Sequence, residues 1–209
     1  MKMNQTMQVA QRPISAGNPC PFLRALVADG KLADSVEPLG KLVSTIVDVA
    51  KRGEGAPDVK PGAVRVIAMM ANGLSPLAVL RSNLKGVQLD ALRDGPLNKK
   101  GVGSGILNVT GEVNPQELAR LKEFASQKTS ASGASELGLS LDEITTFMDA
   151  NFKRAEGKRR RIDRALMNGE WPVLLRVMGK NGTMGRYLSF ADVETLIVDR
   201  RLPERMREQ

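Results

Sequence analysis

The sequence predicts an all-α protein in which a single domain holds about eight helices. Three observations lead to this prediction. Hydrophobic residues make up 42% of the 209 residues, enough for a globular core. Apolar residues recur along most of the chain at the three- and four-residue spacing of a helix face. Proline, serine and glycine stand where helices would begin and end, and no internal repeat is visible.

Four helices are expected in the first half of the chain, and proline or glycine residues mark most of their ends. These helices cover residues 18–30, 39–52, 61–72 and 75–85. Residues 95–105 are rich in glycine and predict a loop. Short strands remain possible around Val102–Val113.

Four more helices are expected in the second half. They begin after Asn114, after Ser140, within the basic stretch that starts at Lys153, and after Ser189. The pattern Ser140-Leu-Asp-Glu143 is a capping box. The small, polar segment 126–135 and the glycine-containing segment 179–185 are expected to be surface loops.

Cys20 is the only cysteine, and it stands directly before the first helix. The unpaired N–H groups and the positive dipole end of a helix N-terminus stabilise negative charge, so a sulfur there is favoured as a thiolate. The placement suits a metal-binding thiolate. A buried, unreactive thiol and a redox sensor are the alternatives, and a sensor would have no second cysteine to resolve it.

The composition excludes several classes of function. There is no histidine, which rules out histidine-bearing triads, two-histidine zinc motifs and histidine-ligated haem. Aromatic residues make up only 3%, which argues against stacking platforms for single-stranded nucleic acid. No signal-peptide pattern is visible, and no run approaches the roughly 18 apolar residues of a membrane span. These features predict a cytoplasmic, reduced protein.

The residues after Cys20 complete a longer pattern. Asn18–Leu32 contains the order Pro-Cys-Pro-x-Leu-x-Ala-Leu-x-x-x-Gly-x-Leu. This order resembles the segment that carries the axial cysteine in the haem-thiolate peroxidases, the family of chloroperoxidases and unspecific peroxygenases. The resemblance implies a chloroperoxidase-like fold with an irregular arm at residues 1–17 and one helical haem-binding domain at residues 18–209. It also implies that Cys20 is the thiolate ligand of the iron in haem b.

A second match lies near the C-terminus. Gly169-Glu170 precedes an apolar helix, which is followed by a glycine loop and by Asp199–Pro203. This arrangement resembles the distal segment of the same family and implies that Glu170 is the acid–base residue that cleaves hydrogen peroxide. A thiolate ligand favours O–O scission. The expected function is therefore that of a peroxidase or peroxygenase that oxidises a small, apolar to amphipathic organic substrate.

The chain departs from the family pattern at two places. The family holds a structural magnesium ion with a Glu-Gly-Asp or Glu-His-Asp motif, whereas residues 97–104 contain no carboxylate, which makes magnesium doubtful. Lys99 or Lys100 could pair with a haem propionate instead, and either fits equally as a solvated lysine. The arginine that orients the acid in peroxygenases is matched by Asp163, so the orienting residue stays open.

Other interpretations remain beside the enzyme. The stretch Glu170–Leu175 also resembles the end of caleosins, but these use histidine ligands and an EF-hand, and Ile106 stands where the EF-like run 106–117 would need its first acidic ligand. A haem sensor or carrier without turnover would use Cys20 alone. The net charge of +8 allows a basic protein that binds an acidic partner, nucleic acid or a membrane surface through Lys153–Arg164, and a solvated helix face explains that run as well.

Overall fold

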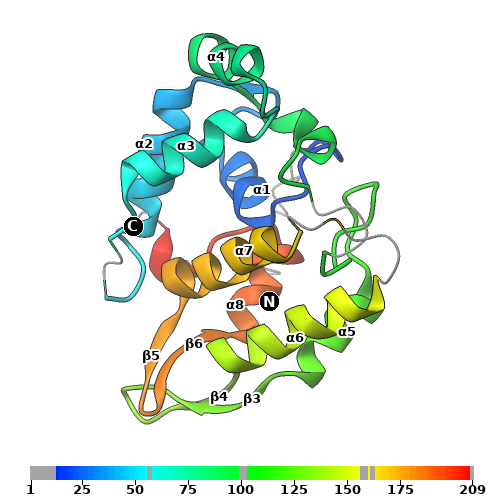
Figure 1. Cartoon of the computed structure of the whole chain (residues 1–209). Helices are drawn as coiled ribbons and strands as arrows, with labels where there is room; N and C mark the ends of the chain where they lie inside the picture. The colour runs from blue at the N-terminus through cyan, green and yellow to red at the C-terminus, as the bar shows by residue number, and fades with distance from the viewer. Residues whose placement is uncertain (1–12, 56–57, 99–102, 156–159, 161–162, 208–209) are drawn as a thin grey trace, which may run out of the picture.

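The structure is a computed structural model that describes residues 13–55, 58–98, 103–155, 160 and 163–207. In these residues a mainly helical first half is followed by two units that contain both helices and strands (Figure 1). The elements of the first half are α1 (Pro21–Ala28), β1 (Val36–Glu37), α2 (Leu39–Ala50), α3 (Pro61–Met70), α4 (Pro76–Lys85), β2 (Val87–Gln88) and the short 3-10 helix η1 (Leu89–Asp94).

The second half repeats one order of elements, helix–hairpin–helix. The first unit is α5 (Pro115–Glu123), β3 (Ser126–Thr129), β4 (Ser135–Ser140) and α6 (Leu141–Arg154), and the second is α7 (Asp163–Met178), β5 (Lys180–Gly182), β6 (Gly185–Ser189) and α8 (Phe190–Ile197). The 3-10 helix η2 (Glu204–Met206) follows. The two hairpins join through β4 and β6, with Leu139 opposite Leu188, into an antiparallel sheet of order β3-β4-β6-β5.

The prediction of an all-α fold is wrong, because the described residues form this sheet and a second, two-stranded sheet of β1 and β2. The segments 126–135 and 179–185, for which the sequence predicts loops, contain the strands β3 and β5 and the two hairpin turns. Their residues are mostly polar or glycine, so the alternation of apolar and polar residues that identifies a strand is missing. Backbone pairing and polar contacts hold them instead: the Ser135 hydroxyl donates to Gln127 Oε1 at 3.1 Å.

The core connects both halves of the chain. A single cluster of buried apolar side chains includes residues of α1, α2, α6, α7 and α8. Helix α1 lies against α8, and α7 packs against α6 and β6 (Figure 1). At the centre of the second half, the ring of Phe147 makes edge contacts with Phe124 at 5.4 Å and with Trp171 at 5.7 Å between centroids. The helices α1 and α7 thus border the same core, with Cys20 directly before α1 and Glu170 at the middle of α7 rather than before a helix as the sequence predicts.

Helices α3 and α4 form a hairpin that packs against α2 and projects from the rest of the molecule (Figure 1). Each of the two helices buries a single residue, Ala68 in α3 and Ser82 in α4. No helix in the described part of the chain is both long and apolar enough to cross a membrane.

Candidate functional site

Cys20 is the N-cap residue of α1, and Pro21 occupies the first turn as its fixed φ angle favours. The side chain is half-buried and packs against the core cluster. The backbone N–H of Cys20 donates to Asn18 Oδ1 at 3.1 Å, which fixes the turn before the helix. The helix N-terminus favours the thiolate form of this sulfur, whereas the apolar side chains beside it favour the neutral thiol.

A buried arginine anchors the loop that carries Cys20. Arg24, one turn into α1, is 2% exposed. Its guanidinium donates to the carbonyl oxygens of Ser15 at 2.8 Å, Asn18 at 3.0 Å and Gly111 at 3.0 Å. Burial lowers the pKa of Arg24, and the positive charge of Arg200 lowers it further. These bonds connect the start of the Cys20 loop to a turn about 90 residues further along the chain.

A second arginine holds the same loop from the other side. Arg93, in η1, donates from Nε to the Ala16 carbonyl at 2.8 Å and from Nη2 to the Asn108 carbonyl at 2.7 Å. The backbone N–H of Arg93 donates to the Gly17 carbonyl at 2.8 Å. A Cβ at Gly17 would lie 1.6 Å from the Asp90 carbonyl oxygen, so this close approach requires glycine.

Asn18 leaves a polar atom beside Cys20 without a partner. Its side chain is completely buried, and its Oδ1 accepts the Cys20 N–H. Its Nδ2 has no hydrogen-bond partner among the residues that the structure describes. A buried amide N–H without an acceptor costs about 1–3 kcal/mol, which a ligand or an anionic sulfur at this position could offset.

One residue whose charge acts on Arg24 has an unusual backbone conformation. Arg200, in the turn after α8, has a φ of 53° and is the one residue other than glycine with positive φ in the described part of the chain. Its positive charge lowers the pKa of Arg24, as does the positive charge of Arg93. The charges of Arg24, Arg93 and Arg200 thus interact, and the carboxylate of Asp34, which accepts the Ser15 N–H at 2.7 Å, partly offsets them. Sequence reasoning missed all three arginines. Arg24 could have been identified, because it is the one charge within an eight-residue apolar helix.

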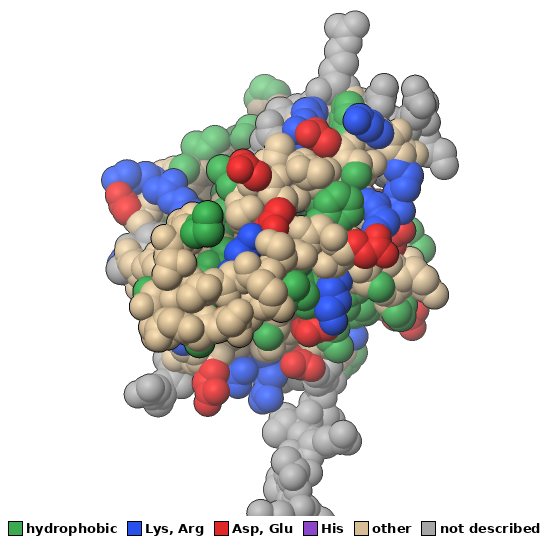
Figure 2. All heavy atoms as spheres, turned by 90° about the horizontal axis from the view of Figure 1, so that it is seen from below, with side chains coloured by type: hydrophobic (Ala, Val, Ile, Leu, Met, Phe, Trp, Pro, Cys, Tyr) green, Lys and Arg blue, Asp and Glu red, His purple; other side chains and the backbone are tan. Residues whose placement is uncertain are grey.

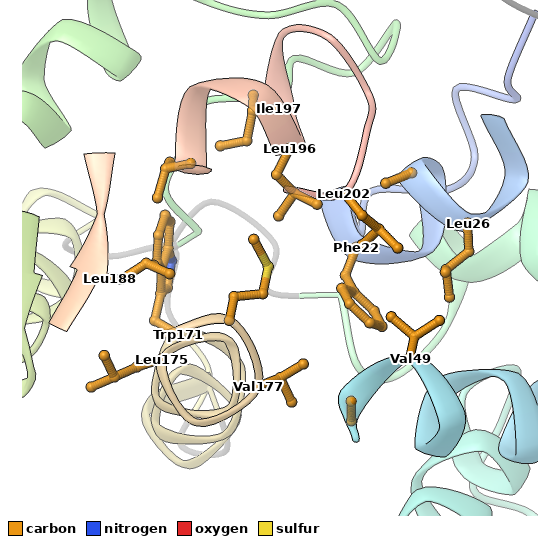
Figure 3. Packing of buried hydrophobic residues seen from close by; sticks show 14 of the residues in the cluster. Phe22, Leu26, Val49, Trp171, Leu175, Val177, Leu188, Leu196, Ile197 and Leu202 are labelled. Carbon is orange, nitrogen blue, oxygen red and sulfur yellow. The ribbon is translucent and has the colours of Figure 1, made fainter. Parts of the chain in front are cut away.

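Glu170 lies in α7 and is half-buried, next to the buried Trp171. Between α1 and α7, apolar side chains of α1, α7, α8 and the following turn converge, among them Phe22, Leu196 and Leu202 (Figure 3). The structure describes one hollow of about 440 Å³ between Glu54, the β3–β4 turn and Lys180, and one of about 230 Å³ between Lys31 and α2. Neither hollow is lined by Cys20 or Glu170.

The expected propionate partners, Lys99 and Lys100, lie outside the described residues. The loop just before them is held by another cation. Arg160 donates from Nη2 to the Asn98 carbonyl at 2.6 Å and binds the carboxylate of Asp163 at 2.6 Å. Asp163, the position that matches the orienting arginine of peroxygenases, is completely buried and accepts the Arg160 backbone N–H as well. Arg160 thus joins the start of α7 to the segment where the family holds magnesium.

The basic run Lys153–Arg164 is engaged within the chain where it is described. Arg154 forms a bidentate pair with Glu117 at 2.6 and 2.7 Å, and Arg164 pairs with Asp149 at 2.6 Å. With Arg160 on Asp163, three arginines of the run have internal carboxylate partners. The remaining arginines and Lys158 of the run lie outside the described residues.

No group of three or more cysteine and acidic residues that could hold a metal ion exists in the described part of the chain. In the EF-like run 106–117 the last acidic position, Glu117, is bound by Arg154 rather than left for a cation.

A polar cluster that the sequence did not predict joins the two hairpins. Glu136 of β4 accepts hydrogen bonds from Lys180 Nζ at 2.7 Å, from the Tyr187 hydroxyl at 2.6 Å and from the Ser189 hydroxyl at 2.6 Å. Burial alone would raise the pKa of Glu136, but these donors outweigh it and bring the pKa to about 2. Burial and the Glu136 carboxylate together raise the pKa of Tyr187. The cluster fixes how the two helix–hairpin–helix units meet.

Comparison of the chain with family models, with curated proteins and with solved structures finds no match in any of the three. The resemblance to the haem-thiolate peroxidases therefore stays a prediction from the residues of this chain.

Proposed function

We propose that this protein binds haem b through the Cys20 thiolate and uses it for peroxide-dependent oxidation of a small organic substrate. The observation that carries the proposal is the position of Cys20. It is the N-cap of α1, in a loop that Arg24 and Arg93 fix by side-chain hydrogen bonds to five carbonyl oxygens. An axial ligand has to be held in this way, because small displacements of a ligating atom weaken a metal site.

The donor chemistry around Cys20 fits a single axial thiolate. The chain has no histidine to compete for the iron. The helix N-terminus favours the anionic sulfur. The buried amide Nδ2 of Asn18, two residues before Cys20, has no partner among the described residues, and donors near a ligating sulfur tune thiolate-bound iron. When bound, a thiolate-ligated haem supplies iron that favours O–O cleavage of peroxide.

Glu170 is the residue for proton transfer in this proposal. Its carboxylate would take a proton from one oxygen of hydrogen peroxide and return it to the oxygen that leaves as water. To do so it must face the pocket that holds the peroxide. Because apolar side chains fill the space between α1 and α7, the proposal requires Phe22 and Leu202 to move apart when the ring enters (Figure 3).

The experiment that tests the ligand is a carbon monoxide spectrum of the protein reconstituted with haem and reduced. We expect a strongly red-shifted Soret band in the natural chain and its loss in Cys20→Ser. The fluorescence of Trp171, the only tryptophan, gives a second readout that needs no turnover. Haem between α1 and α7 should quench it. An ordinary Soret position, or quenching that is equal in Cys20→Ser, would contradict the assignment.

Replacement of Glu170 separates an enzyme from a haem sensor or carrier. Glu170→Gln keeps the size and polarity of the side chain but removes its function as a base. We expect haem binding to persist and peroxide turnover to fall at least about 100-fold. Glu194→Gln, at an exposed position of α8, is the matched control. If Glu170→Gln and Glu194→Gln had equal peroxide turnover, Glu170 would not be the acid–base residue.

A further inference from the structure

The α3–α4 hairpin exposes a concentration of large apolar side chains. Twelve such side chains are exposed in the described part of the chain, and six of them lie between residues 61 and 85. They are Val66, Ile67, Leu74, Leu77, Leu80 and Leu84. Scattered apolar residues on a surface are ordinary, but a contiguous group indicates an interaction surface.

Three of the six side chains lie on one face of α4. Leu77, Leu80 and Leu84 recur at the spacing that places residues on a single face of α4. Arg65 of α3 donates to Asn83 Oδ1 of α4 at 2.7 Å, so the exposed sides of the two helices adjoin. Val66 and Ile67 are exposed at successive positions of α3, about 100° apart around the helix. The hairpin therefore presents an apolar face on α4, with further exposed apolar side chains on α3, and its place at the periphery of the molecule leaves it accessible (Figure 1).

The charges around this surface have one sign. From Val59 to Leu89 the chain has no acidic residue and four basic ones, Lys60, Arg65, Arg81 and Lys85. Arg81 and Lys85 each follow a leucine of the apolar face and are exposed. On the face of the molecule seen in Figure 2, by contrast, acidic and basic side chains are intermingled. The hairpin is complementary to a partner that is apolar in its interior and negatively charged at its surface.

We propose that the α3–α4 hairpin binds the surface of membranes that contain anionic phospholipid. The leucines of α4 enter the boundary between headgroups and acyl chains, and the cations beside them contact lipid phosphates. Each ten-residue helix is about 15 Å long, half the thickness of a bilayer core, so the helices lie in the plane of the interface. A second copy of the chain is a poorer partner, because two such surfaces would bring eight cations together without an acidic residue.

The test is cosedimentation of the full-length protein with vesicles of phosphatidylcholine, with and without phosphatidylserine. The variant Leu77→Gln/Leu84→Gln changes two side chains that are 76% and 72% exposed, so the fold should tolerate it. It should weaken binding at least about 100-fold. Arg81→Gln/Lys85→Gln should weaken binding to phosphatidylserine vesicles about 25-fold. Val109→Gln/Met184→Gln, which changes apolar side chains at least as exposed elsewhere, is the matched control and should bind normally.

Three results would overturn the proposal. The first is absence of binding to phosphatidylserine vesicles at low salt, which would leave an acidic protein as the partner. The second is binding that the leucine variant retains. The third is a dimer in sedimentation velocity that Leu77→Gln/Leu84→Gln dissociates. None of these results depends on haem, so this proposal and the proposed function can fail separately.

Discussion

Replacement of Arg24 by methionine tests whether the buried guanidinium holds the Cys20 loop. Methionine retains an unbranched apolar stem of similar length but has no donor. The change would leave the carbonyl oxygens of Ser15, Asn18 and Gly111 without the N–H groups that they accept now. Hydrogen bonds to a charged group contribute about 1.5–3 kcal/mol each, and three bonds to one group are not additive. We therefore expect a loss of about 4 kcal/mol in the free energy of unfolding.

Urea denaturation measures this loss directly. With a typical slope of about 2 kcal/mol per molar, the midpoint of Arg24→Met should fall by about 2 M. Arg24→Lys keeps the charge without the planar fork and should lie between the variant and the natural chain. The control is Arg81→Met at an exposed position, which should stay within about 0.5 kcal/mol. If Arg24→Met and Arg81→Met had equal midpoints, the loop would not depend on the guanidinium.

Two further predictions concern close packing and pH. Gly17→Ala should destabilise the protein by about 3 kcal/mol or more in the same denaturation assay, because its Cβ would overlap the Asp90 carbonyl. Gly40→Ala, in a helix and with open space around it, should be neutral or stabilising, and equal effects of the two changes would contradict the argument. Glu136→Gln should cost about 2 kcal/mol at neutral pH. Because the pKa of Glu136 falls from 4.5 to about 2 on folding, its stabilisation is complete above pH 4.5 and disappears as the pH falls toward 2. Midpoints measured across this range should converge, and a constant difference would refute the role of the charge.

Local signals in the sequence predict where helices begin. The capping box predicted at Ser140 is present in both directions, since Ser140 Oγ accepts the Glu143 N–H and Glu143 accepts the Ser140 N–H. Asn114 caps α5 through its side chain in the same way. These signals work because capping involves residues within one turn of each other. The hairpins β3–β4 and β5–β6 lack such signals. They are stabilised by backbone pairing between strands made mostly of polar residues and glycine. For the same reason the repeated helix–hairpin–helix order, clear in the structure, has no counterpart in residue identities.

The candidate site was likewise predictable from the sequence only in part. The placement of Cys20 at a helix start follows from Pro21 and the residues after it. What fixes the position of Cys20 does not, since Arg93 and Gly111 come from distant parts of the chain. The one local signal was a charged residue, Arg24, within the apolar first helix. A charge at such a position either has buried partners or destabilises the fold, and here it has three.

The position of Cys20 connects ligand capture with folding stability, and this connection gives the last prediction. A ligand that binds only the folded chain stabilises it by about 2.7 kcal/mol at a hundred times its dissociation constant. If Cys20 ligates haem, the midpoint of urea denaturation should rise by about 1 M when haem is added to the natural chain. Cys20→Ser should lose most of this rise while its midpoint without haem changes little, because the half-buried sulfur contributes little packing. Arg24→Met should lose stability without haem and also part of the rise, since its loop no longer holds the sulfur in place. An equal rise in the natural chain and in Cys20→Ser would show that haem binds elsewhere, because only ligation by the sulfur makes the two chains differ.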